Sequence, residues 1–474
     1  MENRKKVVII GGGITGLSAA FYLQKEVLDQ KLPIEISLIE AKPQLGGKIE
    51  TVRKDGFVIE RGPDSFLERK KSATQLVKDL GMEKELVNNA TGQAYVFARE
   101  QLNPIPEGSV MGIPTNIGPF ITSGLFSIPG KMRAAYDFIL PKRTVEGDQS
   151  LGQFFRRRLG DEVVDNLIEP LLSGIYAGNI DDMSLLSTFP QFYEMEQKNR
   201  SLIVGLKKTM PKAQPKRKKG IFQTVKTGLQ SVVEEIEKQL TAVDVKKGIK
   251  VERFVKTGEG YTLTLSNGEE MAADSVIVAT SHQVLTNLVQ DNRIDLSYFD
   301  SMPATSVATV AMAFPEEAVK LTSNGTGFVI SRNSGFTITA CTWTHRKWLH
   351  TAPKGKALLR AYVGKAGDEA IVEQSDDIIL KTVMDDLKRI MDISGEPDFS
   401  IVSRLKHSMP QYQIGHKEQV QLIKRQMKES IPGIYLTGAS FEGIGIPDCI
   451  DQGKQAVQDV LSYLQAEKRI LTHN

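Results

Sequence analysis

Apolar runs and glycine-rich turns alternate at the start of the chain. Four consecutive apolar residues at 7–10 are followed by glycines at 11, 13 and 16, and apolar residues then recur at helical spacing as far as Leu28. A second apolar run, at 34–39, ends at Glu40. Short apolar runs on either side of an amphipathic helix are typical of parallel strands, so this pattern predicts a β-α-β unit.

Three other patterns follow along the chain. Residues 109–219 have mainly helical spacing with Pro-Gly interruptions, including one predicted helix at 151–168. Residues 300–404 mix strand-like runs with a predicted helix at 376–391, and the chain ends in a strand–glycine–helix pattern between 433 and 464. Both ends of the chain therefore have the pattern of a nucleotide-binding unit.

The length of 474 residues is too great for one ordinary core, so we predict several domains. The predicted fold class is α/β. A discontinuous Rossmann-like domain would carry an inserted β-sheet substrate-binding domain and a helical domain. The predicted ranges are 1–62, 220–299 and 405–474 for the Rossmann-like domain, 63–108 and 300–404 for the substrate-binding domain, and 109–219 for the helical domain.

The first glycine cluster has the spacing of a dinucleotide-binding turn. In such a turn the glycines allow a tight bend, close approach of a pyrophosphate and close packing of helix on strand, and the helix N-terminus attracts the phosphates. Glu40 comes 24 residues after Gly16, near the spacing of a carboxylate that binds ribose hydroxyls. The candidate nucleotide contacts are Gly11, Gly12, Gly13, Ile14, Thr15, Gly16, Glu40 and Ala41.

Two further features favour FAD over NAD. A glycine pair at 46–47, followed by Lys48, permits a second close approach of backbone to the dinucleotide. The predicted C-terminal helix would begin near Ile446-Pro447-Asp448, and its positive end would stabilise negative charge on a reduced flavin ring. Each feature alone could be an ordinary glycine turn, but together they predict that the Rossmann-like domain is an FAD-binding domain.

Composition excludes several other classes of protein. The net charge is only +3, and we interpret the short basic runs at 156–158 and 216–219 as solvated surface, so no nucleic-acid partner is expected. Cys341 and Cys449 are the two cysteines, which gives no disulfide framework and fits a reducing compartment. No metal-ligand spacing occurs among the histidines.

The stretch at 113–140 is too interrupted by proline and charge to span a membrane, and forms either an amphipathic membrane-contacting surface or a buried helical subdomain.

Longer motifs occur at Leu45–Lys48, Gly62–Phe66, Leu167–Gly178, Pro410–His416 and Ser440–Asp448. Together with the first glycine cluster, they resemble motifs of the FAD-containing oxidases of the amine-oxidase and protoporphyrinogen-oxidase superfamily. The resemblance covers essentially the whole chain and is greatest to the oxygen-dependent porphyrinogen oxidases of Gram-positive bacteria. The sequence departs from the plant and animal relatives at Gln93-Ala94-Tyr95, where it has no arginine to bind a propionate.

The resemblance implies oxygen-dependent, six-electron oxidation of coproporphyrinogen III to coproporphyrin III in haem biosynthesis, with some action on protoporphyrinogen IX and with release of hydrogen peroxide. It implies FAD held without a covalent bond, because residues 399–440 contain no cysteine that could attach a flavin. The expected location is cytoplasmic, with peripheral contact at the inner face of the cell membrane or handover to the next haem-pathway enzyme. The alternatives are protoporphyrinogen IX as the main substrate, an amine oxidase or desaturase of the same fold, and a binding protein without turnover.

The resemblance also implies roles for individual residues. The flavin carries the chemistry, so no catalytic side chain and no metal ligand is expected. Gly174 and Lys71 are the candidate substrate contacts. The further candidate cofactor contacts are Gly47, Lys48 at phosphate or ribitol oxygens, Gly62, Pro63, Asp64 and Ser65 at the flavin, Val251 at the adenine, Gly438, and Ile446, Pro447 and Asp448 at the flavin pyrimidine edge.

Overall fold

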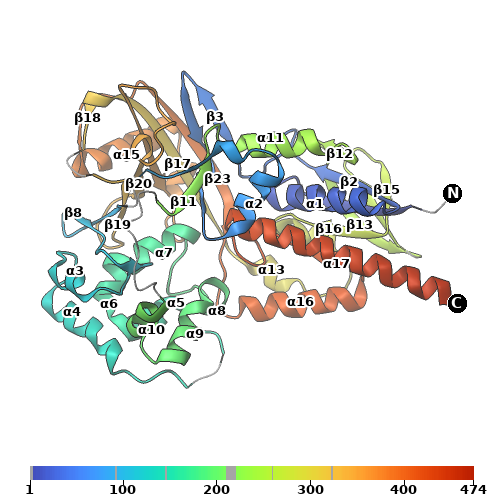
Figure 1. Ribbon diagram of the computed structural model, residues 1–474, viewed down its shortest axis with the longest axis horizontal. Helices are drawn as coiled ribbons and strands as arrows, with labels where there is room; N and C mark the ends of the chain where they lie inside the picture. The colour runs from blue at the N-terminus through green and yellow to red at the C-terminus, as the bar shows by residue number, and fades with distance from the viewer. Residues whose placement is uncertain are drawn as a thin grey trace.

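The computed structural model describes residues 4–90, 93–144, 147–209, 220–258, 260–321 and 324–473. The basic run at 216–219 lies outside the described residues. Figure 1 shows a parallel sheet with long helices on one side of the molecule, a second sheet at the upper left and a group of short helices at the lower left.

The parallel sheet joins segments from both ends and the middle of the chain. Its order is β12-β2-β1-β16-β24, and every neighbouring pair is parallel. The strands are β1 (Lys5–Ile10), β2 (Ile34–Glu40), β12 (Val243–Lys247), β16 (Ser275–Val278) and β24 (Ile434–Leu436).

Both faces of this sheet are covered. Alternate residues of β1 enter two different cores, Val7 and Ile9 on one face and Val8 and Ile10 on the other. The first face packs against α1 (Ile14–Gln30) and α17 (Ile446–His473), which lie side by side in Figure 1. A continuous apolar strand buried on both faces is the expected state of a central parallel strand.

The second sheet has seven strands in the order β23-β17-β21-β20-β19-β7-β8. One face packs against α15 (Asp376–Ile390), close to the helix predicted at 376–391. The strands are β7 (Tyr95–Ala98), β8 (Gln101–Pro104), β17 (Ala304–Pro315), β19 (Gly327–Ile330), β20 (Ile338–Trp343), β21 (Lys356–Val363) and β23 (Phe399–Pro410). Because β23 continues through residue 405, it crosses a predicted domain boundary, and the three-domain division stays a prediction.

Small elements connect the two sheets. A three-stranded sheet in the order β5-β11-β6 lies beside α2 (Lys71–Asp79), and β3 pairs with β4 as a hairpin. These strands are β3 (Thr51–Lys54), β4 (Phe57–Glu60), β5 (Phe66–Leu67), β6 (Leu86–Asn88) and β11 (Phe222–Val225). An antiparallel sheet of β13 (Val251–Thr257), β14 (Gly260–Leu265) and β15 (Glu270–Ala273) borders the parallel sheet.

The segment from 117 to 209 is mainly helical and has its own aromatic core, with Phe154, Phe155 and Phe192 fully buried. In the described part of the chain, no helix is long and apolar enough to cross a bilayer. The main helices of the segment from 117 to 209 are α3 (Ile117–Thr122), α4 (Ile128–Ala135), α5 (Leu151–Leu159), α7 (Glu169–Tyr176), α9 (Pro190–Asn199) and α10 (Leu202–Thr209).

Two expectations for this segment are wrong. The single helix predicted at 151–168 is broken, because Gly160 has a φ of 87° and ends α5. The basic run at 156–158 is also not simply solvated. Arg158 is completely buried and forms ion pairs with Glu196 at 2.5 Å and Asp137 at 3.4 Å. Burial of a charge requires such partners.

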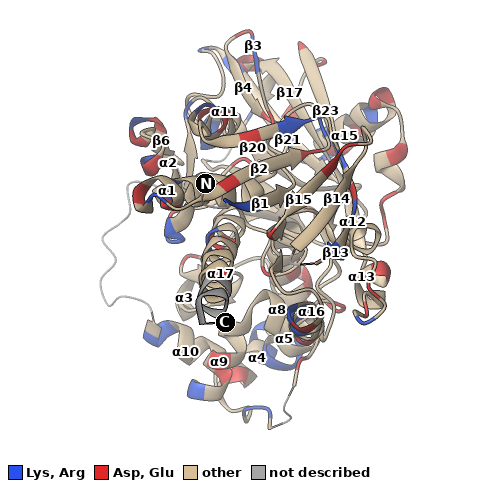
Figure 2. Cartoon of the chain, turned by 90° about the vertical axis from the view of Figure 1, so that its right-hand side faces the viewer, with Lys and Arg blue, Asp and Glu red and all other residues tan. Residues whose placement is uncertain are grey.

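Charged residues are distributed over both the sheets and the helices. In the view of Figure 2, acidic and basic residues are interspersed along the helices and sheet edges, as on an ordinary solvated surface.

Candidate functional site

The first and last glycine motifs lie against each other. A Cβ on Gly438 would be 3.5 Å from Thr15 Oγ1, and one on Gly453 would be 2.5 Å from the Thr15 carbonyl oxygen. Cys449 shares a side-chain hydrogen bond with Thr15. The motifs follow β1 and β24, so they meet at the carboxyl ends of parallel strands, where open α/β sheets bind their ligands.

The turn between β1 and α1 can accept a pyrophosphate. Gly11 has a φ of 107°, and a Cβ on Gly16 would overlap the Gly11 carbonyl oxygen. Among the described residues, nothing lies within 4 Å of the place that a Cβ on Gly13 would occupy. Among the described residues, no side chain caps the N-terminus of α1, and the first turn of α1 contains no acidic residue. Its first N–H groups, from Ile14 onward, are therefore available to an anion.

Glu40 lies at the same turn. Its Oε2 accepts a hydrogen bond from the Gly12 N–H at 2.6 Å, and its Oε1 accepts one from the Lys42 N–H at 2.8 Å. The carboxylate is thereby oriented beside the glycines, where a ribose is expected, and the neighbouring Ala41 is exposed. Val251 is 2% exposed and packs in the same core as Ile10 and Ile39, at the ends of β1 and β2.

Three glycine segments stack on one another beside this turn. The Gly46 N–H donates to the Gly12 carbonyl at 2.8 Å, and a Cβ on Gly47 would be 3.1 Å from the Gly13 Cα. A Cβ on Gly62 would overlap the carbonyl oxygen of Lys48. The motifs at 11–16, 46–48 and 62–65 therefore form one continuous backbone surface, on which an extended dinucleotide can lie.

Lys48 lies at this surface and is exposed. Its Nζ donates to the carbonyl oxygen of Ser408, near the end of β23, and desolvation at that end of the side chain lowers its pKa. The sequence motif singled out Lys48 but gave no indication of Ser408, because that contact joins residues 360 positions apart.

Basic residues of the second sheet region hold the loop at 62–65. Lys347 Nζ forms an ion pair with Asp64 Oδ2 at 2.8 Å, and Arg360 Nη2 donates to the Gly62 carbonyl oxygen. Burial acts to raise the pKa of Asp64, but Lys347 and Arg360 together hold it below its ordinary value. Asp64 is therefore an ionised carboxylate that fixes the loop, and it also accepts from Ser65 Oγ at 2.7 Å.

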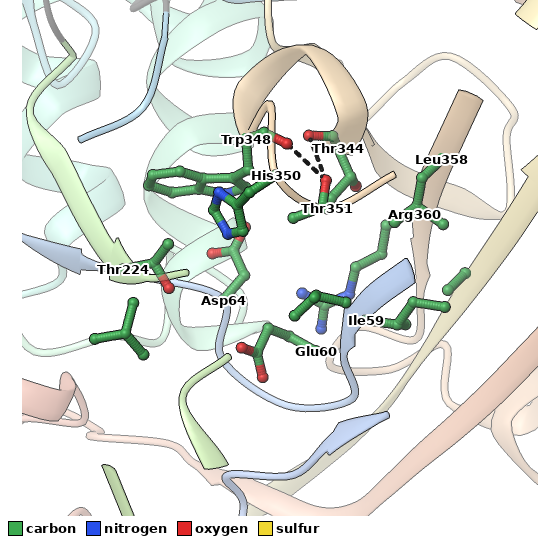
Figure 3. Close-up of a pocket in the computed structure, with 13 residues that line it drawn as sticks. Ile59, Glu60, Asp64, Thr224, Thr344, Trp348, His350, Thr351, Leu358 and Arg360 are labelled. Atoms are coloured by element: carbon green, nitrogen blue, oxygen red, sulfur yellow. Dashed lines mark hydrogen bonds between the residues drawn. The ribbon is translucent and has the colours of Figure 1, made fainter. Parts of the chain in front are cut away.

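A small cavity lies behind this loop, as Figure 3 shows. Its volume is about 20 Å³, and Glu60, Asp64, Trp348 and Arg360 line it. Arg360 Nε and Trp348 Nε1 point to no hydrogen-bond partner within the described chain. A space of this size holds about one water molecule and is far too small for a macrocycle. Burial raises the pKa of Glu60 to about 7, so the loop rests on a titratable polar cluster.

The start of α17 is tied to the start of α2. Asp448 forms an ion pair with Lys70 at 2.5 Å, and Ser72 Oγ donates to the Pro447 carbonyl oxygen at 3.2 Å. Ile446 is partly buried beside them. Lys71, the predicted substrate contact, is exposed at the first residue of α2. Its neighbour Lys70, which the sequence did not single out, is the lysine that contacts Asp448.

Gly174 lies on α7 at an open surface. No described atom comes within 4 Å of the place that a Cβ on Gly174 would occupy. Two residues later, the Tyr176 ring is 5.6 Å from the ring of Tyr412. The Tyr412 hydroxyl donates to the Ala439 carbonyl at 2.6 Å and accepts from the Gly443 N–H at 2.9 Å. This contact connects α7 to the segment that leads into α17.

Tyr412 and His416 are structural residues of this junction. Their rings stack at 4.1 Å between centroids, and His416 Nε2 lies 2.9 Å from the Phe441 carbonyl oxygen. Their position in the 410–416 motif was a signal that sequence analysis could use. Lys347 and Arg360 had no comparable motif, and only the folded sheet brings them to the loop at 62–65.

Comparisons with known proteins agree with this geometry. Residues 14–461 match the family described as flavin containing amine oxidoreductase. The chain is 60% identical to coproporphyrinogen III oxidase of Bacillus subtilis, with 98% of this chain and 99% of the relative covered. It is 46% identical to the enzyme of that name from Staphylococcus aureus, with 97% and 100% covered.

A solved structure is also similar. A protein of Exiguobacterium sp. 255-15, provisionally named protoporphyrinogen oxidase, has 38% identity and a TM-score of 0.86, with 97% of this chain and 99% of that chain covered. The open turn at Gly13, the uncapped start of α1 and the stacked glycine segments all fit an FAD. The cofactor is FAD, and the chain belongs to the flavin-containing amine oxidoreductase family.

Proposed function

We propose that this protein is an oxygen-dependent oxidase that converts coproporphyrinogen III to coproporphyrin III. The observation that carries the proposal is the 60% identity to a coproporphyrinogen III oxidase over nearly the whole of both chains. The reaction removes six electrons in three turnovers and yields hydrogen peroxide from O2. Protoporphyrinogen IX is a further substrate, converted to protoporphyrin IX, and as main substrate it is the second candidate, supported by the name of the Exiguobacterium protein.

FAD, when bound, supplies hydride acceptance from a methylene bridge and electron transfer to O2. The chain's own residues bind the FAD and orient it. The turn at 11–16 and the start of α1 hold the pyrophosphate, and Glu40 holds the adenosine ribose. Ala41, Gly47 and Lys48 continue this surface towards the ribitol, and Val251 borders the adenine.

The flavin ring would lie between the loop at 62–65 and the start of α17. Lys347 and Arg360 fix that loop through Asp64 and Gly62, so it does not move when the ring changes charge. The helix start at Ile446–Asp448, with Gly438 behind it, presents its positive end to the pyrimidine edge. Gly174 offers its carbonyl to a pyrrole N–H, and Lys71 offers a cation to a propionate.

The location proposed is cytoplasmic, with peripheral contact at the inner face of the membrane. Supporting it, four large apolar residues on α4 and just after it are more than half exposed, namely Ile128, Met132, Tyr136 and Ile139. Their spacing of three or four residues places them on one face, and an exposed apolar face beside Lys131 suits a membrane surface. The same face can serve handover of product to the next haem-pathway enzyme.

The test is to add coproporphyrinogen III to the purified yellow protein without oxygen and then in air. Porphyrin fluorescence that appears with oxygen consumption supports the proposal. Bleaching of the flavin absorbance by amines, with no response to porphyrinogen, would instead identify an amine oxidase. Protein that purifies without flavin would identify a binding protein without turnover.

A further inference from the structure

Glu169 is a buried carboxyl group to which the proposed function assigns no role. It is the first residue of α7 and is 7% exposed. The Ser173 hydroxyl, one helical turn further on, donates a hydrogen bond to it. The preceding residues, Val164–Ile168, form a π-helix (η3), a local distortion that occurs frequently at functional sites.

Ser173 borders the open face of α7. The next two residues, Gly174 and Ile175, are exposed, and Ile175 is 43% exposed despite being apolar. The same helix reaches the start of α17, because Asp448 is close enough to contribute, after burial, to the raised pKa of Tyr176. The pair Glu169–Ser173 is therefore adjacent to Gly174, the proposed substrate contact, on a helix that reaches the start of α17.

The chemistry of the proposed reaction requires a proton acceptor in such a place. The full oxidation removes four C–H hydrogens and two pyrrole N–H hydrogens, as three hydrides and three protons. In net terms, two of the three two-electron steps each break one methylene C–H bond and one pyrrole N–H bond, and the remaining step removes two C–H hydrogens. In each of those two steps the C–H hydrogen leaves with its electron pair as a hydride to the oxidised flavin, and the N–H hydrogen leaves as a proton. We propose that the Glu169 carboxylate accepts this proton through the Ser173 hydroxyl, which takes the pyrrole proton as it passes its own to Glu169. This inference rests on the proposed function.

The charged groups around Glu169 suit this task. Burial raises its pKa, and Arg332, Ser173 and Lys365 only partly oppose that rise, while Asp165 adds to it. Arg332 and Asp165 also have other partners, since Arg332 donates to Asn179 Oδ1 at 2.9 Å and Asp165 pairs with Arg156 at 2.8 Å. A carboxylate with a raised pKa is a stronger base near neutral pH.

The experiment follows flavin reduction by coproporphyrinogen III in anaerobic stopped-flow, with the FAD-loaded protein, as a function of pH. The wild-type rate should rise with pH to a plateau as Glu169 loses its proton. Glu169→Gln should be slower by about 100-fold or more, with no pH dependence. Ser173→Ala should be slowed as well, and Glu169→Asp should recover part of the rate.

Two further readouts separate proton transfer from a structural role. Binding of coproporphyrin III, measured by fluorescence quenching, and FAD content should be unchanged in Glu169→Gln. Asp165→Asn is the matched control: it should keep the plateau rate and move the inflection to lower pH, because it removes a negative charge near Glu169.

Several results would overturn the inference. One is a Glu169→Gln enzyme with the wild-type rate and pH profile, and another is a loss of porphyrin binding or FAD in proportion to the loss of rate. If Glu169→Gln does not fold, the pH profiles of flavin reduction in Glu169→Asp and Asp165→Asn provide the same test. A wild-type protein that binds FAD and does not react with coproporphyrinogen III would refute the proposed function itself, and with it this inference.

Discussion

At the scale of single residues, Glu40 joins the sequence motif to the cofactor surface most directly. Its carboxylate accepts the Gly12 and Lys42 N–H groups and faces the dinucleotide turn. Hydrogen bonds to a charged group contribute about 1.5–3 kcal/mol, so Glu40→Ala should weaken FAD binding by tenfold or more. Flavin released on dilution, followed by fluorescence, measures the dissociation constant. Glu35→Ala, an exposed position on the same strand, is the control, and unchanged FAD affinity in Glu40→Ala would remove the ribose assignment.

A second residue-scale prediction concerns the ion pair under the flavin loop. Lys347→Met should destabilise the protein by about 3 kcal/mol, because it leaves Asp64 as a partly buried carboxylate with less compensation. Adding Asp64→Asn should recover part of that loss, since the uncompensated charge is then gone. Denaturant unfolding measures both, with Lys354→Met, at an exposed position, as control. Equal stability of Lys347→Met and wild type would show that the pair does not hold the loop.

The third residue-scale prediction is a pH dependence. Burial lowers the pKa of His416 to about 4, below its unfolded value near 6.5. The unfolded state therefore binds more protons than the folded state in this interval, so stability is complete above about pH 6.5 and falls towards pH 4. The full loss is ~3 kcal/mol.

The variant His416→Gln checks this prediction. Wild type should be more stable than the variant by an amount that shrinks as pH falls from 6.5 to 4, measured by denaturant midpoints. A constant difference across that range would show that His416 does not titrate between these values.

At the scale of elements, periodicity predicted what hydrophobic spacing determines. The β-α-β start, the helix at 376–391 and the terminal helix follow from apolar residues at regular intervals, and the structure has them. The helix predicted at 151–168 failed, because the apolar spacing continues past Gly160 while the backbone there has a positive φ. The prediction that the basic run at 156–158 is solvated was also wrong for Arg158. The sequence of the run does not show that Glu196 and Asp137 lie close enough to pair with a buried Arg158.

The element-scale prediction concerns the exposed face of α4. Wild type should bind vesicles that contain anionic lipid, and the double change Ile128→Ser with Met132→Ser should reduce the bound fraction several-fold, because it removes two of the four apolar side chains that the face exposes. Sedimentation with vesicles measures binding. Leu349→Ser, at a position 76% exposed outside this face, is the control. Absence of wild-type binding at low salt would contradict the membrane contact.

At the scale of the whole molecule, the site is assembled from distant segments. The sequence predicted that both ends of the chain meet, because each carries a strand followed by glycines, and Thr15 does lie against Gly438 and Gly453. It could not place Lys347, Arg360, Lys70 or Ser408, since their positions depend on how the second sheet and α2 pack against the first. Motifs therefore identified the backbone surface of the site, and tertiary packing determined the side chains that support it.

The central claim is that this fold oxidises a porphyrinogen fully with oxygen as acceptor. The most direct measurement is the ratio of O2 consumed and hydrogen peroxide formed to coproporphyrin III produced from coproporphyrinogen III. Removal of six electrons as three two-electron steps predicts three O2 and three hydrogen peroxide per coproporphyrin III. Formation of coproporphyrin III without matching oxygen consumption, or flavin-loaded protein that forms none, would contradict the account.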